Sequence, residues 1–162
     1  MGRGTNLVLD IIALEELPSG QVPAYEAVLA DRFPYHSVQG TVGLWSKYPM
    51  SNTRPVDIKM GWTRAMRSTV TTPKGEAIAY ERLGKVILLG DLNGTMNDRS
   101  LNEVTSQMRS TQGAAGDGFG WLASSPMARI DQIMVKGVEP MSSWTLPATD
   151  SDHLPIAARV EL

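Results

Sequence analysis

The stretch K-V-I-L-L-G-D-L-N, residues 85–93, decides the fold predicted for this chain. Its four aliphatic residues, 86–89, predict a strand buried on both faces, and we expect it to be a central strand. Gly90 ends the apolar run, and an acid and an amide follow at once in Asp91 and Asn93. Such residues are ordinary in turns, but α/β enzymes also keep their catalytic groups where strands end. The stretch alone therefore leaves a polar turn and an active site open.

The composition indicates one globular domain spanning residues 1–162, because 162 residues with 42% hydrophobic content can bury a sizeable core. The net charge is −2, and the sequence has no run of Lys or Arg that would follow a nucleic-acid backbone. The absence of cysteine excludes a disulfide framework and a thiolate metal site. No apolar stretch approaches the length of a membrane span. The compartment stays open, and we expect a monomer.

The rest of the pattern predicts many strands and few helices, hence an α/β fold with two packed sheets and helices outside. Gly43 is expected to allow close packing of its strand. The predicted strands are 5–9, 10–17 (buried, ending in Glu15 and Glu16), 35–38, 41–46, 86–89, 130–135, 144–146 and 156–162, with a hairpin over 62–80 that turns at 73–75. The predicted helices are 23–33 and 100–110, the second capped by Ser100, and 111–120 is expected to be a glycine-rich loop.

Acidic and amide side chains recur at the ends of these predicted strands, and one histidine stands beside the last of them. Carboxylate oxygens are the donors that Mg²⁺ prefers, and a histidine that handles protons needs an orienting carboxylate. Each residue also has a structural interpretation: a solvated acid, an Asp131–Arg129 surface pair or a turn cap, and His36 is interpreted as structural. The candidates are Glu16, Asp91, Asn93, Asp131, Asp152 and His153.

Five segments together resemble the endonuclease/exonuclease/phosphatase superfamily, to which DNase I-like nucleases belong, and occur in that family's order. They are D-I-I-A-L-E-E-L (10–17), G-L-W-S-K-Y-P-M (43–50), G-D-L-N-G-T (90–95), R-I-D-Q-I-M-V (129–135) and S-D-H-L-P-I-A-A-R (151–159). The resemblance implies a four-layer α/β sandwich of two mixed sheets flanked by helices. It also implies hydrolysis of a phosphoester with Mg²⁺ or Mn²⁺.

The resemblance assigns a role to each matching residue. Glu16, Asp152 and, by a weaker match, Asn6 would hold the metal. Asp91 and Asn93 would orient the attacking water and contact the phosphate. His153 would be the catalytic imidazole, oriented by Asp131, and either His153 or Asp91 would act as the base. Trp121 would line the pocket, although packing explains this residue equally well.

The sequence departs from the family pattern in two places. The family carries a histidine-bearing strand and a helix before G-D-x-N, but here Ala77–Tyr80 runs directly into Glu81. The crossover expected after the first strand is missing as well, at about Leu9–Asp10. Both breaks fall at connections, where disorder concentrates. We therefore interpret the chain as a family domain that lacks segments near 9/10 and 80/81.

The substrate follows only as a class. The low net charge favours a small or lipid-like phosphodiester or phosphomonoester over duplex DNA. The alternatives are a Mg²⁺-dependent nuclease and a catalytically silent relative that binds a phosphorylated ligand or a protein. The C-terminal half most resembles bacterial members, which implies a cytoplasmic, exported or membrane-tethered protein.

Overall fold

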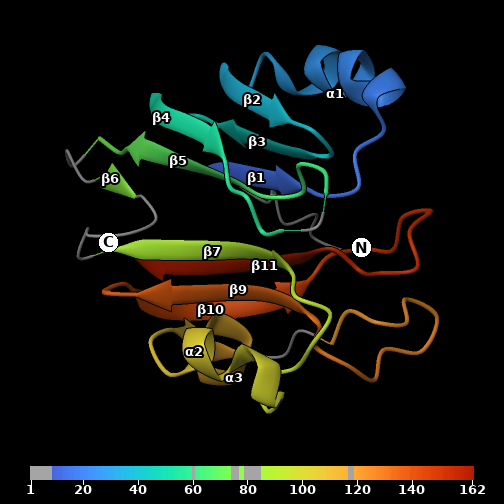
Figure 1. Cartoon of the computed structure of the whole chain (residues 1–162), viewed down its shortest axis with the longest axis vertical. Coiled ribbons are helices and arrows are strands. Elements are labelled where there is room, and N and C mark those ends of the chain that lie inside the picture. Colours follow the sequence, from blue (N-terminus) through green and yellow to red (C-terminus); the bar gives the residue numbers. More distant parts are fainter. Residues whose placement is uncertain (1–8, 60, 74–76, 79–84, 117–118) are drawn as a thin grey trace, which may run out of the picture. The chain divides into compact units, whose positions relative to one another are not determined.

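The computed structural model describes residues 9–59, 61–73, 77–78, 85–116 and 119–162. The chain forms two compact units, Met1–Glu76 and Ala77–Leu162 (Figure 1). The strand predicted over 5–9 and the hairpin turn at 73–75 lie almost wholly outside the described residues. Within the described part, no helix has the length and apolar character needed to cross a membrane. A single domain that lacks two segments stays a prediction.

The first unit contains two antiparallel arrangements of strands. In one sheet β3 lies between β1 and β2, and elsewhere β4 pairs with β5. The sequence pattern did not predict β4, because its residues are mostly exposed and polar and so form no apolar run. The described elements are β1 (Ile11–Leu14), a 3-10 helix (Ser19–Gln21), α1 (Val22–Leu29), β2 (Tyr35–Gln39), β3 (Val42–Ser46), β4 (Met50–Pro55) and β5 (Met66–Thr71).

The core of the first unit forms around Trp45, which is fully buried and packs with Leu17 and Phe33. Helix α1 ends four residues before Phe33, whose amide donates to the Leu29 carbonyl at 2.8 Å. Gly43 packs as expected, since a Cβ at this position would lie 2.3 Å from the Trp45 ring. β1 is only half-buried, which corrects the prediction of a buried strand over 10–17.

The second unit contains a three-stranded sheet and a two-stranded one. β9 lies between β7 and β8, β10 pairs with β11, and all these pairings are antiparallel. Helix α3 packs against β9 and β10 (Figure 1). The described elements are β6 (Ala77–Ile78), β7 (Val86–Asp91), a 3-10 helix (Arg99–Leu101), α2 (Asn102–Thr105), β8 (Arg109–Ser110), α3 (Thr111–Ala115), β9 (Asp131–Lys136), β10 (Glu139–Thr145) and β11 (Ile156–Glu161).

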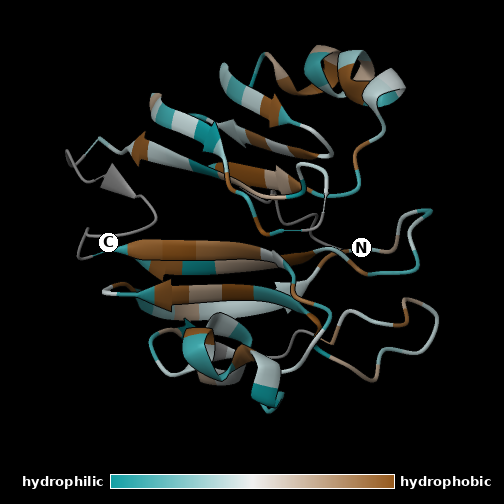
Figure 2. Cartoon of the chain, in the orientation of Figure 1, coloured by the Kyte–Doolittle hydropathy of each residue, from teal (hydrophilic) through white to brown (hydrophobic). Residues whose placement is uncertain are grey.

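The strand predicted at residues 86–89 does form, as β7, but β9 and not β7 is the central strand of this sheet. Its residues after Val86 are only half-buried, whereas Ile133, Met134 and Val135 of β9 are nearly inaccessible. Figure 2 shows that β7 is hydrophobic along most of its length all the same. An apolar run predicts a strand, but the burial of that strand depends on its neighbours, which periodicity does not reveal.

Two further predictions in this unit were wrong in detail. The helix expected over 100–110 is a 3-10 turn followed by the short α2, and the chain is extended again from Arg109. Its cap is Asp98, whose carboxylate accepts from the Ser100 amide at 2.9 Å. The loop expected over 111–120 begins with the short helix α3. The fold class is nevertheless α/β, with many strands and few helices, as predicted.

Candidate active site

The candidate site lies where β7 and β9 meet at one end of their sheet. The register of the antiparallel pair sets Asp91, the last residue of β7, opposite Asp131, the first residue of β9. Asn93 adopts a left-handed backbone conformation (φ 49°) and its amide donates to Asp91 Oδ1 at 2.8 Å. Asparagine tolerates this conformation better than most residues do. The G-D-L-N motif is therefore both a turn and the carrier of a carboxylate.

His153 pairs with Asp131 across this end of the sheet. The imidazole Nδ1 lies 3.1 Å from Oδ1 and 3.0 Å from Oδ2 of Asp131. Because a carboxylate accepts hydrogen bonds, Nδ1–H is the donor, and this fixes the tautomer of the ring. The loop that carries His153 is held on both sides: Ser151 Oγ accepts from the His153 amide at 3.1 Å, and the Leu154 amide donates to the Gly120 carbonyl at 2.8 Å.

The two members of this pair both have shifted pKa values. Burial raises the pKa of the Asp131 carboxyl, the nearby Asp91 charge adds to this, and the bond to His153 opposes it. Burial alone would lower the pKa of His153, but the bond to Asp131 and the charges of Asp131, Asp91 and Asp152 raise it above its ordinary value near 6.5. These contacts thus stabilise the protonated imidazole relative to a free histidine side chain.

Gly120 leaves room for the Asp131 carboxylate. A Cβ at this position would lie only 2.9 Å from Asp131 Oδ2 and 3.2 Å from the Leu154 carbonyl oxygen. The next residue, Trp121, is half-buried, and its backbone forms isolated antiparallel β-bridges with Ala128 and His153. Trp121 thus lies beside the catalytic candidates, while its role as a pocket-lining residue stays a prediction.

The donor set suits a hard cation through its oxygens. Ligand atoms of Asp91, Asp131 and His153 all lie within 4.8 Å of one another. The imidazole Nδ1 is engaged by Asp131, so the carboxylates are the groups that match the preference of Mg²⁺ or Mn²⁺ for oxygen ligands. Asp152, predicted as a metal-side carboxylate, is exposed, and its main-chain oxygen accepts from the Ala123 amide at 2.7 Å.

The other two predicted metal ligands belong to the first unit. Glu16 follows β1 with an exposed side chain and accepts from Arg64 Nη2 at 3.2 Å, and the Arg64 guanidinium lies over the ring of Trp62, 5.6 Å from its centre. Asn6 lies outside the described residues. The structure therefore brings Asp91, Asp131 and His153 together, and the metal-binding roles of Glu16 and Asn6 stay predictions.

The surface pair considered for Asp131 is replaced by other contacts. The Arg129 guanidinium stacks over the ring of Phe119 at 4.2 Å, and Asp131 binds His153 instead. Sequence reasoning also missed Gln112, a buried side chain bonded to the Asp131 backbone, because the glycine-rich composition of 111–120 predicted a loop. A glutamine beside a buried strand end is too common a feature to have singled it out.

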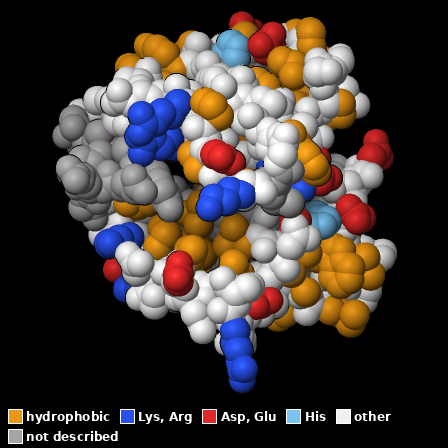
Figure 3. All heavy atoms as spheres, in the orientation of Figure 1, with side chains coloured by type: hydrophobic (Ala, Val, Ile, Leu, Met, Phe, Trp, Pro, Cys, Tyr) orange, Lys and Arg blue, Asp and Glu red, His pale blue; other side chains and the backbone are white. Residues whose placement is uncertain are grey.

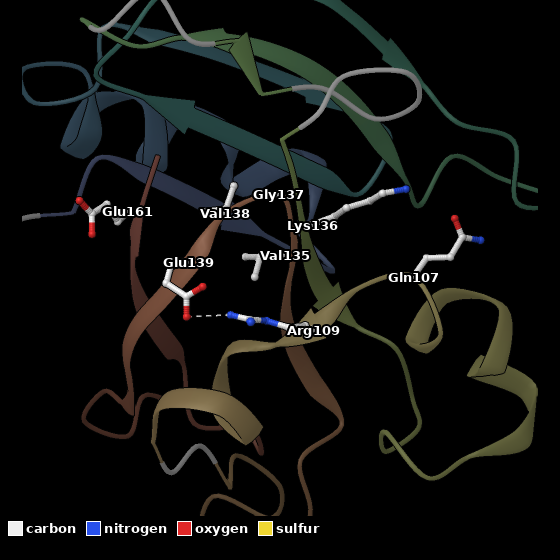
Figure 4. Close-up of a pocket in the computed structure, with 8 residues that line it drawn as sticks. All are labelled: Gln107, Arg109, Val135, Lys136, Gly137, Val138, Glu139 and Glu161. Carbon is white, nitrogen blue, oxygen red and sulfur yellow. Dashed lines mark hydrogen bonds and ion pairs between the residues drawn. The ribbon is translucent and has the colours of Figure 1, made fainter.

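A hollow lies at the opposite end of the β7–β9–β8 sheet from the candidate site (Figure 4). It has a volume of about 510 Å³ and is lined by β9, β8 and the turn into β10. Its charges are mixed: Arg109 pairs with Glu139 at 2.9 Å, and Lys136 and Glu161 line it as well. None of the candidate catalytic residues lines this hollow, so the chemistry is expected at the Asp131 end of the sheet.

Known structures share this fold at low sequence identity, and no curated protein matches the chain. An endonuclease/exonuclease/phosphatase family protein from Leptotrichia buccalis C-1013-b superposes with a TM-score of 0.73 at 13% identity, covering 94% of this chain and 87% of that one. An endonuclease/exonuclease/phosphatase from Bacteroides vulgatus gives 0.73 at 15% identity over 95% and 85%. Truncated TDP2 from Caenorhabditis elegans gives 0.64 at 16% identity over 91% and 82%.

A family model matches nearly the whole chain, including every predicted site residue. The match runs over residues 5–153, and the model describes the Endonuclease/Exonuclease/phosphatase family. Together with the shared fold, this shows that the chain belongs to the endonuclease/exonuclease/phosphatase family.

Proposed function

We propose that this protein is a divalent-metal-dependent phosphoesterase, which hydrolyses a phosphodiester or phosphomonoester by in-line attack of water. The observation that carries the proposal is the cluster of Asp91, Asp131 and His153, whose ligand atoms lie within 4.8 Å of one another. Members of this family generally hydrolyse phosphoester bonds. A partly buried His–Asp pair beside a second carboxylate is an arrangement suited to proton transfer and charge stabilisation.

In this proposal His153 binds the phosphoryl group. Its Nδ1–H is bonded to Asp131, so the opposite ring nitrogen, Nε2, is the atom proposed to contact the substrate. The raised pKa of His153 favours the imidazolium, and an imidazolium Nε2–H donates to a phosphoryl oxygen as negative charge develops there. Asp131 holds the ring in place and keeps the proton on Nδ1.

Asp91 is then the proposed group that orients the attacking water and accepts its proton. The turn bond from the Asn93 amide to Oδ1 fixes the carboxylate orientation. Asn93 itself is exposed at the turn and is proposed to contact the phosphate. This division gives the base role to Asp91 and the charge-stabilising role to His153, because the upward shift of the His153 pKa favours its protonated form over a proton-accepting role.

A divalent cation fits the oxygen donors of this site. Asp152 is the carboxylate of the second unit proposed to hold it, because the Asp131 carboxylate is engaged by His153 and Asp91 is assigned to the attacking water. When bound, Mg²⁺ or Mn²⁺ polarises a phosphoryl oxygen and offsets negative charge.

The proposed substrate is a small or lipid-like phosphoester. The net charge of −2 provides no overall attraction for a polyanion, and on the face drawn in Figure 3 acidic side chains lie among the basic ones. A nuclease remains the alternative within the same family, since the family description names endonucleases and exonucleases beside phosphatases.

The test is hydrolysis by the purified protein with Mg²⁺ or Mn²⁺, offered a generic phosphodiester, phosphomonoesters, sphingomyelin and plasmid DNA. We expect turnover of at least one small or lipid ester, its loss with EDTA, and a drop of about a hundredfold or more in Asp91→Ala. Asp150→Ala is the matched control, because Asp150 is an exposed aspartate of the same unit outside the cluster.

Three results would change the proposal. Metal-dependent cleavage of DNA alone, falling steeply with salt, would favour the nuclease. No hydrolysis of any ester would leave a binding-only protein, and equal rates in Asp91→Ala and the wild type would remove Asp91 from the mechanism. Glu16→Gln tests the predicted metal glutamate separately: we expect a higher Mg²⁺ concentration for half-maximal rate, and an unchanged one removes Glu16 from the ligand set.

A further inference from the structure

The short strand β8 pairs only with the C-terminal part of β9. Its two residues pair with Val135 and Met134, and the chain then leaves the sheet at Ser110 to begin α3. The first residues of β9, from Asp131 to Ile133, extend past this pairing. Their backbone groups on that side are buried in the sheet and need other partners, because an unpaired buried amide or carbonyl is costly.

The side chain of Gln112 supplies these partners. Its Nε2 donates to the Asp131 carbonyl at 2.7 Å, and its Oε1 accepts from the Ile133 amide at 3.4 Å. A neighbouring strand would likewise form hydrogen bonds with the backbone of alternate residues, here Asp131 and Ile133. The amide of Gln112, which is only 1% exposed, therefore extends the ladder by one position at the residue that carries the catalytic carboxylate.

Ser110 holds this amide in its orientation. The Ser110 hydroxyl lies 3.1 Å from Gln112 Oε1 and 3.1 Å from the Oε1 of Gln132, another fully buried glutamine. Gln132 Nε2 in turn donates to the Arg129 carbonyl. The backbone is thus bonded to buried side chains at Arg129, Asp131 and Ile133, that is, two residues before the site residue, at it, and two residues after it.

We propose that Gln112 is a positioning residue for the Asp131–His153 pair. Fixing the Asp131 carbonyl fixes the origin of its side chain, and both carboxylate oxygens then reach His153 Nδ1 at 3.0–3.1 Å. Gln112 touches neither the imidazole nor the substrate in this scheme and acts only through Asp131. The inference rests on the proposed function for its kinetic effect, whereas its structural effect on His153 does not depend on activity.

The decisive variant is Gln112→Met, which keeps the length of the side chain and removes both bonds. We expect kcat to fall about ten- to a hundredfold with KM nearly unchanged, because a misplaced catalytic pair lowers turnover more than binding. We also expect the ¹⁵N resonance of His153 Nδ1 to shift in metal-free protein. The chain has only two histidines, so His153→Ala assigns the signals and His36 serves as the internal reference.

Ser143→Ala is the control, since it also removes a buried hydrogen bond in the same unit, from Ser143 Oγ to the Ala157 carbonyl. It is expected to cost stability without moving the His153 signal. If Gln112→Met does not fold, Gln112→Asn, which keeps an amide on a shorter stem, is measured the same way. A His153 signal and a kcat that stay at wild-type values overturn the inference. An inactive wild type whose His153 signal still responds overturns only the proposed function.

Discussion

The two histidines of this chain each pair with a carboxylate, and the two pairs differ in their surroundings. His36 Nε2 lies 3.2 Å from Glu26 Oε1, and the two side chains are 35% and 42% exposed. Its ring stacks on Trp45, with centroids 5.9 Å apart and planes 8° from parallel. His153 lies 3.0 Å from Asp131, at 24% and 18% exposure, with the charges of Asp91 and Asp152 also acting on it.

A His–carboxylate contact at about 3 Å is thus not in itself a site. In the His36 pair one partner is exposed to water and the other face of the ring is covered by an indole, which leaves a structural contact. In the His153 pair both side chains are partly buried, and two further carboxylates favour the charged ring. Electrostatic interactions strengthen as the surroundings become less polar, and this difference in environment is what makes the second pair suited to chemistry.

The largest expected effect separates the two histidines directly. His153→Ala removes the proposed phosphate-binding group and should lower kcat by up to about a thousandfold, within the range of a lost charge-stabilising donor. His36→Ala removes a stacked structural ring and should leave kcat within about threefold, by the same reasoning. Steady-state rates at saturating Mg²⁺ measure both. If kcat fell by a similar factor in both variants while both remained folded to the same extent, the two pairs would not differ in function.

The carboxylate partners give a second contrast of smaller size. Asp131→Asn keeps the shape but removes the charge that holds the proton on Nδ1, and the pKa of His153 should fall because that charge and bond raise it. We expect kcat to drop about a hundredfold or more. Glu26→Gln, the equivalent change at the exposed pair, should leave kcat unchanged. NMR titration of the two histidines reads the pKa change, and an unmoved His153 titration would show that Asp131 does not control it.

The sequence predicted the candidate site better than its surroundings. The R-I-D and S-D-H motifs identified Asp131 and His153 as partners, because a proton-handling histidine needs a carboxylate, and the structure places them in contact. The strand register that sets Asp91 against Asp131 was not predictable, since pairing depends on contacts distant in sequence. Helix positions failed where tertiary packing overrides local preference: Met108 is buried in the core although it lies beyond α2.

The third effect concerns the space around the Asp131–His153 pair. Gly120→Ala would place a methyl group 2.9 Å from Asp131 Oδ2, so the carboxylate must move away from His153. We expect kcat to fall about tenfold and stability to fall by about 1–3 kcal/mol, as for other overpacked sites. Gly20→Ala is the matched control, because no atom lies within 4 Å of a Cβ there. Full activity in Gly120→Ala would mean that Asp131 tolerates displacement.

The smallest effect is the pH dependence of folding stability, and it follows from the raised pKa of His153. A histidine whose folded-state pKa exceeds its unfolded value near 6.5 binds its proton more tightly when folded. The stabilisation is therefore complete below pH about 6.5 and is lost as the pH rises through the higher folded value. The free energy of unfolding, measured by urea titration at several pH values, should favour the wild type over His153→Gln more at pH 6 than at pH 9. His36→Gln provides the comparison at the exposed pair, and a wild-type advantage over His153→Gln that grows with pH would reverse the sign assigned to the buried pair.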